Sequence, residues 1–251
     1  MKNIILPIQK TNSLYKTQKI GSSPMFDPMA IAGNAETVSA CPNGWSYIND
    51  MTDVEVTELQ KPSGKFVDIS KMMNEEALDD GMRRLLLSAE KAGLVTFSEL
   101  YRVNYSEDGD QLGSSSHRTY EDAMNVAFGN DSLISSQKEW VGTRKLAEQL
   151  GISEDLAVSK GDTYAVIAMI EEYSKKGMPI DGIYWKEDYN PSSLKSPFMA
   201  IFPHKTQEWS SHPCPMPASD EELMKRLPKI TNMNLAISAP EFKASDLAQS
   251  M

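Results

Sequence analysis

The amino-acid sequence predicts an α+β protein with a mixed β core, flanking helices and flexible ends. Three observations lead to this prediction. Amphipathic helical patterns and short apolar or alternating runs both occur along the chain. A hydrophobic fraction of 40% in 251 residues is sufficient for a folded body. Residues 10–43 and 228–251, by contrast, carry no sustained helical or strand period. We therefore expect the fold to lie in the middle of the chain.

The composition excludes several classes of function. A formal net charge of −10 opposes binding to nucleic acids, because proteins that bind phosphate backbones normally present basic patches. The apolar runs fall short of the roughly 18 residues that a membrane span requires, so we expect no integral membrane segment. Cys41 and Cys214 are far apart in sequence and suggest no disulfide framework. We therefore expect a soluble protein of a reducing compartment.

Composition also divides the chain into three parts. We expect residues 1–44 to be a flexible leader, residues 45–227 a single α+β domain of catalytic type with its core at 94–209, and residues 228–251 a weakly ordered tail. The leader, rich in Ser, Thr and Asn, resembles that of bacterial effectors exported by needle-type secretion systems. This resemblance implies a secreted effector acting in a host cytosol. The alternative is a cytoplasmic protein with an ordinary flexible terminus.

Helix signals occur at several places in the middle of the chain. Apolar residues in the segment 70–92 recur with helical spacing, and a glycine follows them. Thr119 and Asp122 have the spacing of a capping box, which predicts a helix from there to Ala127. Two further helices are expected at about 137–150 and 162–177, each stopped by a glycine.

Strand signals separate these helices. We expect one or two short strands in residues 45–59, a turn at 61–65 and a half-buried strand at 94–105. We expect two further strands in the apolar runs 180–185 and 197–202, and the length of the loop between them allows the two to pair as a hairpin.

The strand at 94–105 contains Arg102 among aromatic and aliphatic neighbours. A guanidinium group stays charged, so its burial beside a sheet is costly unless a carboxylate, a phosphate or backbone carbonyls meet its donors. One interpretation is a structural ion pair or a solvent-facing arginine. The other is an anchor for an anion or a dinucleotide. The residue type alone leaves both open.

Three short motifs favour the second interpretation of Arg102, an anchor for a dinucleotide. Leu100-Tyr101-Arg102 resembles the first-strand motif of the cholera and pertussis toxin class of ADP-ribosyltransferases, and Ser114-Ser115-Ser116 resembles the Ser-Thr-Ser strand of that class. The runs Asp181 to Trp185 and Phe198 to Phe202 resemble the closing strands of RES-domain NAD-degrading toxins, which share the fold. The resemblance implies an ADP-ribosyltransferase-like core and a mono-ADP-ribosyltransferase or NAD glycohydrolase. It also implies NAD as substrate, a protein acceptor and a possible activating partner.

The resemblance also suggests roles for individual residues. Arg102 would hold a phosphate of NAD, and a serine hydroxyl would orient the catalytic acid. A carboxylate would stabilise the oxocarbenium-like centre formed when nicotinamide leaves, and we expect Glu187 in this role, with Asp181 second. The cofactor-binding residues expected in addition are Tyr101, Tyr105, Ser114, Ser115, Ser116, Tyr184 and Trp185.

Two departures and one alternative accompany this hypothesis. The interval between Arg102 and the serines is shorter than in the toxins, and a clean Glu-x-Glu pair is missing. The serine run also fits a plain loop leading into the next helix.

We expect no metal site, because His204, His212 and Cys214 lack the usual zinc spacing. The alternative function is a non-enzymatic effector or binding protein that contacts a protein partner through an acidic surface.

Overall fold

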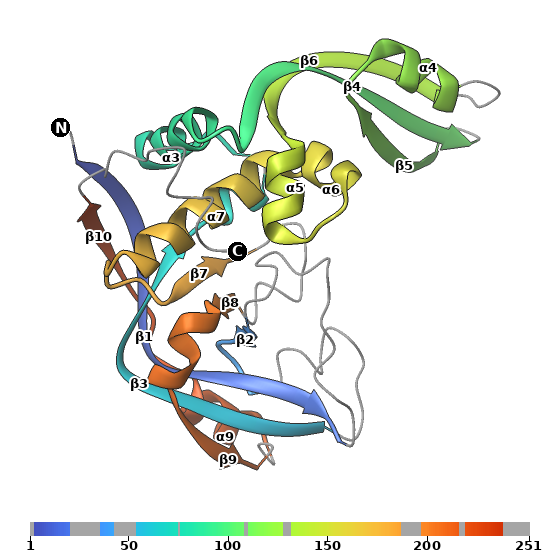
Figure 1. Ribbon diagram of the computed structural model, residues 1–251. Coiled ribbons are helices and arrows are strands. Elements are labelled where there is room, and N and C mark those ends of the chain that lie inside the picture. Colours follow the sequence, from blue (N-terminus) through green and yellow to red (C-terminus); the bar gives the residue numbers. More distant parts are fainter. Residues whose placement is uncertain are drawn as a thin grey trace. The chain divides into compact units, whose positions relative to one another are not determined.

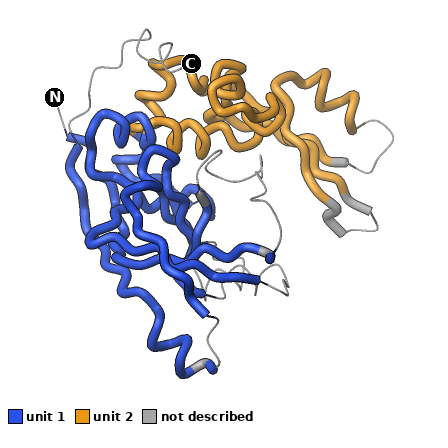
Figure 2. Tube along the Cα trace, turned by 60° about the horizontal axis from the view of Figure 1, so that its bottom comes forward, with its two compact units in different colours: residues 1–83, 170–239 blue, residues 84–169, 240–251 orange. Residues whose placement is uncertain are grey.

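The computed structural model describes residues 3–20, 36–42, 54–74, 76–107, 110–127, 132–186, 197–215 and 219–237. Within these ranges the protein is α+β, as the sequence predicts, and it forms two compact units (Figures 1 and 2). Unit 1 comprises residues 1–83 and 170–239, and unit 2 comprises residues 84–169 and 240–251. The chain thus forms two units where we expected a single domain over residues 45–227.

Unit 1 is built on a seven-stranded mixed sheet with the order β10-β1-β2-β8-β7-β3-β9. The strands are β1 (Ile4–Lys19), β2 (Glu36–Ser39), β3 (Val54–Asp68), β7 (Gly182–Trp185), β8 (Phe198–Ile201), β9 (Ser210–Cys214) and β10 (Thr231–Ile237). Strand β1 also pairs with β3, so β1, β2, β8, β7 and β3 close into a barrel-like ring. Strand β3 pairs in parallel with β7 and antiparallel with β1 and β9.

The expected hairpin of apolar strands is confirmed. Strands β7 and β8 pair antiparallel, and every one of their residues is buried. Their side chains join a core cluster in which large apolar groups from distant segments meet. The fully or nearly buried members of this cluster are Leu14, Val38, Ala40, Leu59, Phe66, Tyr184, Met199, Ile201 and Trp209. Continuous apolar runs therefore mark strands that are buried on both faces.

The expectation of a flexible leader does not hold for residues 4–19, which form β1. Ile4, Leu6 and Ile8 are buried at alternate positions, and the strand pairs with both β10 and β3. Pairing with β1 also orders residues 231–237 of the segment expected to be a weak tail. The turn expected at 61–65 lies inside β3 instead. Polar sequence alone does not reveal strands whose backbone partners come from distant parts of the chain.

Short helices complete unit 1. They are α2 (Ser70–Met73), the 3-10 helix η1 (Pro203–Glu208) and α9 (Asp220–Arg226). Ser219 caps α9 by accepting a hydrogen bond from the backbone N–H of Glu222. The chain passes into unit 2 within α3 (Asp80–Lys91) and returns within α7 (Gly161–Lys175). None of the described helices is long and apolar enough to cross a membrane.

Unit 2 contains a three-stranded antiparallel sheet with the order β5-β4-β6 (Figure 1). Its strands are β4 (Val95–Glu107), β5 (Asp110–His117) and β6 (Ser132–Gly142). Its helices are α4 (Tyr120–Ala127), α5 (Arg144–Leu150) and α6 (Glu154–Ser159), together with the parts of α3 and α7 that belong to this unit. The capping box is confirmed: Asp122 N–H donates to Thr119 Oγ1, and that hydroxyl donates to the Asp122 carboxylate. Leu100, Val141 and Val158 form the buried cluster between sheet and α6.

One expectation about unit 2 is wrong, and one open alternative is decided. The helix expected over 137–150 begins only after Thr143, which caps α5, because residues 132–142 pair with β4 along its length. For Ser114 to Ser116 the sequence left a strand and a plain loop open, and the structure shows the strand, as part of β5. In both segments the polar side chains obscure a strand that β4 stabilises through backbone hydrogen bonds.

Candidate functional site

Arg102 lies in the central strand of the unit 2 sheet and is bound by Glu139 of β6. Its Nε donates to Glu139 Oε1 at 3.3 Å, and its Nη2 donates to Oε2 at 2.9 Å. Gln137 Nε2 donates to Glu139 Oε1 at 3.0 Å and fixes the carboxylate from a second side. The Arg102 and Glu139 side chains remain 30% and 26% exposed, so solvent reaches the pair. A two-point pairing of this kind holds both groups in a defined orientation.

The strand register decides which residues share a face with Arg102. Arg102 lies directly opposite Ser116 of β5 and Ser135 of β6. Because successive side chains of a strand point to opposite faces, Ser114 and Ser116 share the face of Arg102. Ser115 lies opposite Val103 and therefore belongs to the other face, with Tyr101 and Tyr105. The structure thus divides the predicted serine and tyrosine residues between two faces of one sheet.

A chain of hydrogen bonds runs across the second face. Tyr105 Oη lies 2.6 Å from Ser115 Oγ, and Ser115 Oγ lies 2.7 Å from His117 Nε2. All three side chains are half-buried, and the neighbouring Val103 is fully buried. The sequence alone gave His117 no role. Its spacing of two from a strand serine is the signal that places both side chains on one face.

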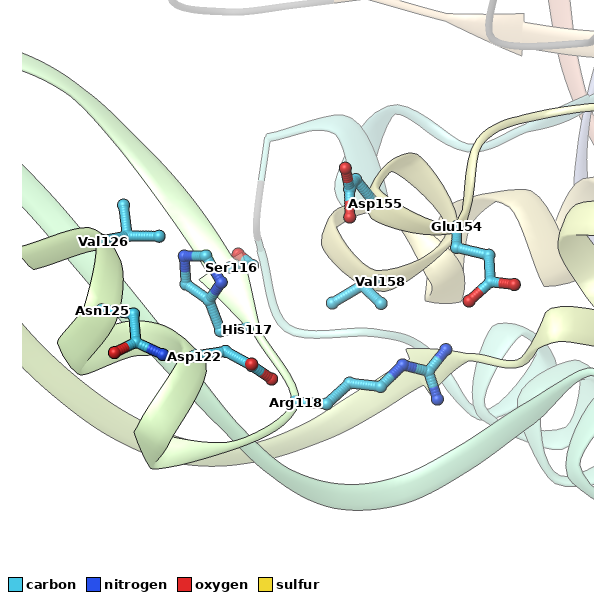
Figure 3. Close-up of a pocket in the computed structure, with 9 residues that line it drawn as sticks. All are labelled: Ser116, His117, Arg118, Asp122, Asn125, Val126, Glu154, Asp155 and Val158. Carbon is cyan, nitrogen blue, oxygen red and sulfur yellow. The ribbon is translucent and has the colours of Figure 1, made fainter.

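A pocket of about 390 Å³ lies next to this series of hydrogen bonds and is lined by His117 (Figure 3). Its walls come from the end of β5, from α4 and from α6. The lining residues are Ser116, His117, Arg118, Asp122, Asn125, Val126, Glu154, Asp155 and Val158. The guanidinium of Arg118 donates to the backbone carbonyl of Gly142. Three carboxylates against one guanidinium give the pocket a negative balance.

A further carboxylate lies near Glu139. Asp162, at the start of α7, accepts hydrogen bonds from the backbone N–H and the hydroxyl of Thr163. Burial raises the pKa of Asp162 above its ordinary value, and the charge of Glu139 acts in the same direction. The partner of Arg102, Glu139, therefore lies close enough to a second acidic side chain to influence its charge.

The other predicted site residues belong to unit 1. Asp181 is 3% exposed, accepts the backbone N–H of Lys65 at 2.8 Å and forms an ion pair with Lys61. Tyr184 and Trp185 are buried, and Trp185 packs against Phe198 at a ring distance of 5.8 Å. These contacts account for all three as parts of the unit 1 core. Glu187, the first choice for the catalytic acid, lies outside the described residues.

Glu139 is the acidic residue that the sequence-based reasoning missed. The helix predicted over residues 137–150 left no reason to expect Glu139 on a strand beside Arg102. The need of Arg102 for a carboxylate partner was the signal that pointed towards such a residue. Among the described residues, we find no group of three or more His, Cys, Asp or Glu side chains arranged to hold a metal ion.

Comparisons with known proteins assign no family. No protein-family model matches the chain, and neither a curated protein nor a solved structure matches it. The two faces of the unit 2 sheet carry the side-chain arrangements from which a function can be inferred.

Proposed function

We propose that the protein cleaves the bond between nicotinamide and ribose in NAD and transfers ADP-ribose to a protein acceptor or to water. The observation that carries this proposal is the two-point hydrogen bonding of Arg102 to Glu139, with Ser116 opposite Arg102 on the same face. An arginine, a serine and a glutamate from three neighbouring strands thus share one face of one sheet. The proposal keeps Arg102 as the phosphate anchor and replaces Glu187 by Glu139 as the acid.

The chemistry assigns a separate task to each group. The guanidinium of Arg102 offers paired donors that match the oxygens of a phosphate. Departure of nicotinamide takes the electrons of the glycosidic bond and leaves positive charge on the ribose, which the Glu139 carboxylate stabilises. Gln137 holds that carboxylate through its own hydrogen bond and is a positioning residue. The exposure of the ion pair gives a dinucleotide access to both groups.

The direct test measures nicotinamide release and transfer of labelled ADP-ribose. Purified protein is incubated with labelled NAD and a eukaryotic cell extract, which supplies acceptor proteins and any activating partner. We expect Glu139→Gln to lower NAD consumption by about 100-fold, the usual range for loss of a catalytic carboxylate. Arg102→Ala should weaken NAD binding, seen as loss of the melting-temperature increase that NAD gives to the wild type.

Glu90→Gln is the matched control, because Glu90 is an exposed glutamate on α3 of the same unit. It should consume NAD at the wild-type rate. Circular dichroism of Glu139→Gln separates loss of catalysis from loss of folding. If the folded wild type neither binds nor consumes NAD in the presence of extract, or if Glu139→Gln retains full activity, the proposal is wrong.

A further inference from the structure

We infer that Ser115 is a nucleophile activated by His117 and that the adjoining pocket accepts uncharged or cationic acyl esters. Ser115 and His117 lie on the face of the sheet opposite Arg102 and Glu139. The pocket lies at the end of β5, where His117 of this face and Ser116 of the other both line it. The inferred activity goes beyond the proposed cleavage of NAD and does not depend on it.

The geometry of the serine and the histidine meets the first requirement of such a pair. A nucleophilic hydroxyl and its base must lie within about 2.6–3.2 Å of each other. Ser115 Oγ lies 2.7 Å from His117 Nε2. The two residues are separated by one residue in strand β5, so the backbone itself holds both side chains on one face. The pairing therefore depends on the strand and not on a flexible loop.

Tyr105 completes the arrangement from the neighbouring strand. Its hydroxyl lies 2.6 Å from Ser115 Oγ, so one hydrogen bond of the serine is directed at Tyr105 and the other at His117. When Tyr105 donates to Ser115, the serine hydroxyl donates to Nε2, and His117 carries its proton on Nδ1. This is the tautomer that can accept the serine proton. Tyr105 is a positioning residue, because it acts through Ser115.

The surroundings of Ser115 and His117 hold these side chains in place and still leave them partly exposed to solvent. Val103, opposite Ser115 in the register, is fully buried and supports the face from β4. Ser115 and His117 themselves are half-buried, and His117 lines the pocket shown in Figure 3. A substrate in that pocket would lie against the imidazole ring. The base is thus packed in place while solvent and substrate still reach it.

The pocket also limits the charge of the substrate. The carboxylates of Asp122, Glu154 and Asp155 line it together with the guanidinium of Arg118. A surplus of negative charge repels anionic substrates and attracts cationic ones. The apolar side chains Val126 and Val158 add a surface for aliphatic groups. An acyl ester with an uncharged or cationic alcohol part fits this combination.

The reaction step balances without a co-reactant other than water. Ser115 Oγ forms a bond to the carbonyl carbon of the ester while His117 Nε2 takes the hydroxyl proton. The bond from that carbon to the alcohol oxygen breaks, and the alcohol leaves with the proton from His117. Water then forms a bond to the acyl carbon while His117 Nε2 takes its proton. The bond from that carbon to Ser115 Oγ breaks, Oγ takes the proton from His117, and the acid is released.

The test uses a phosphonofluoridate probe with a fluorophore, which labels activated serines by forming an Oγ–P bond and releasing fluoride. The full-length protein is incubated with the probe, and the labelled peptide is identified by mass spectrometry. We expect one label, on Ser115. Ser115→Ala should abolish it, and His117→Gln should slow it by about 100-fold, the effect expected when a general base is lost.

Ser136→Ala is the matched control, because Ser136 is an exposed serine on β6 of the same sheet. It should be labelled at the wild-type rate. Tyr105→Phe should slow labelling and also the hydrolysis of an uncharged nitrophenyl ester, whereas a purely structural role would lower only the melting temperature. The inference fails if the folded wild type is labelled no faster than heat-denatured protein, or if Ser115→Ala is labelled equally well. Neither result bears on NAD consumption, which is measured separately.

Discussion

The ammonium group of Lys61 forms an ion pair with the carboxylate of Asp181 inside unit 1. The Asp181 side chain is only 4% exposed, and it also accepts a hydrogen bond from the backbone N–H of Lys65. Lys61 is bound in addition by Glu208 of η1, so one lysine connects strand β3 with two other segments. Asp181 thus has a structural task that is independent of catalysis.

Lys61→Met should destabilise the protein by about 3 kcal/mol, because it leaves a buried carboxylate without its counter-charge. Lys71→Met, at an exposed position of α2, should change the free energy of unfolding by less than about 0.5 kcal/mol. Urea unfolding followed by circular dichroism measures both. Equal stability of the two variants would show that the ion pair contributes nothing.

A double-mutant cycle on Arg102 and Glu139 should give a coupling energy of about 1 kcal/mol, the upper range for a partly exposed ion pair. The four proteins are the wild type, Arg102→Met, Glu139→Gln and the double variant. Two hydrogen bonds join the pair, so the single changes should not be additive. Additive unfolding free energies would contradict the pairing seen in the structure.

The stability of the protein should fall as the pH is lowered from 4.5, the ordinary pKa of a glutamate, towards about 2. Hydrogen bonds from Lys61 and then from Lys205 lower the pKa of Glu208 to about 2. Because the folded value lies below the unfolded one, the stabilisation is present above pH 4.5 and is lost as the pH falls through the folded value.

Glu208→Gln should therefore reduce the dependence of the unfolding midpoint on pH within this window. The effect should be modest and should decrease with added salt, since the Glu208 side chain is 44% exposed. Urea midpoints measured across the acidic range test this expectation. An unchanged pH dependence in the variant would contradict it.

Gly182→Ala should destabilise unit 1 by about 3 kcal/mol or prevent folding. An added Cβ would overlap the backbone carbonyl of Ala200, at the point where β7 pairs with β8 and β3. Backbone atoms within a sheet cannot move aside without breaking their hydrogen bonds. Gly113→Ala is the control, because a Cβ at Gly113 would meet nothing within 4 Å. Similar melting temperatures for both variants would refute the close packing at Gly182.

Local signals in the sequence were sufficient for several elements. The α+β class, the capping box at Thr119 and the apolar strands β7 and β8 follow from residue spacing and composition alone. The positive φ of 74° at Gly93 and of 90° at Gly177 agrees with the helix stops predicted there. These features depend on neighbours within a few residues, so a single sequence determines them.

The polar strands and the candidate sites were decided only by the tertiary structure. β1 and β6 are strands because segments far away in the sequence satisfy their backbone hydrogen bonds, whereas β5 pairs with β4, which directly precedes it. The many polar side chains of these strands do not reveal the pairing. Arg102 needed a carboxylate partner on grounds of charge alone, but the register of β4 and β6 selected Glu139 as that partner. The same register separated Ser115 from Ser116. A shift by one residue would exchange the two faces, and the sequence does not encode that register locally.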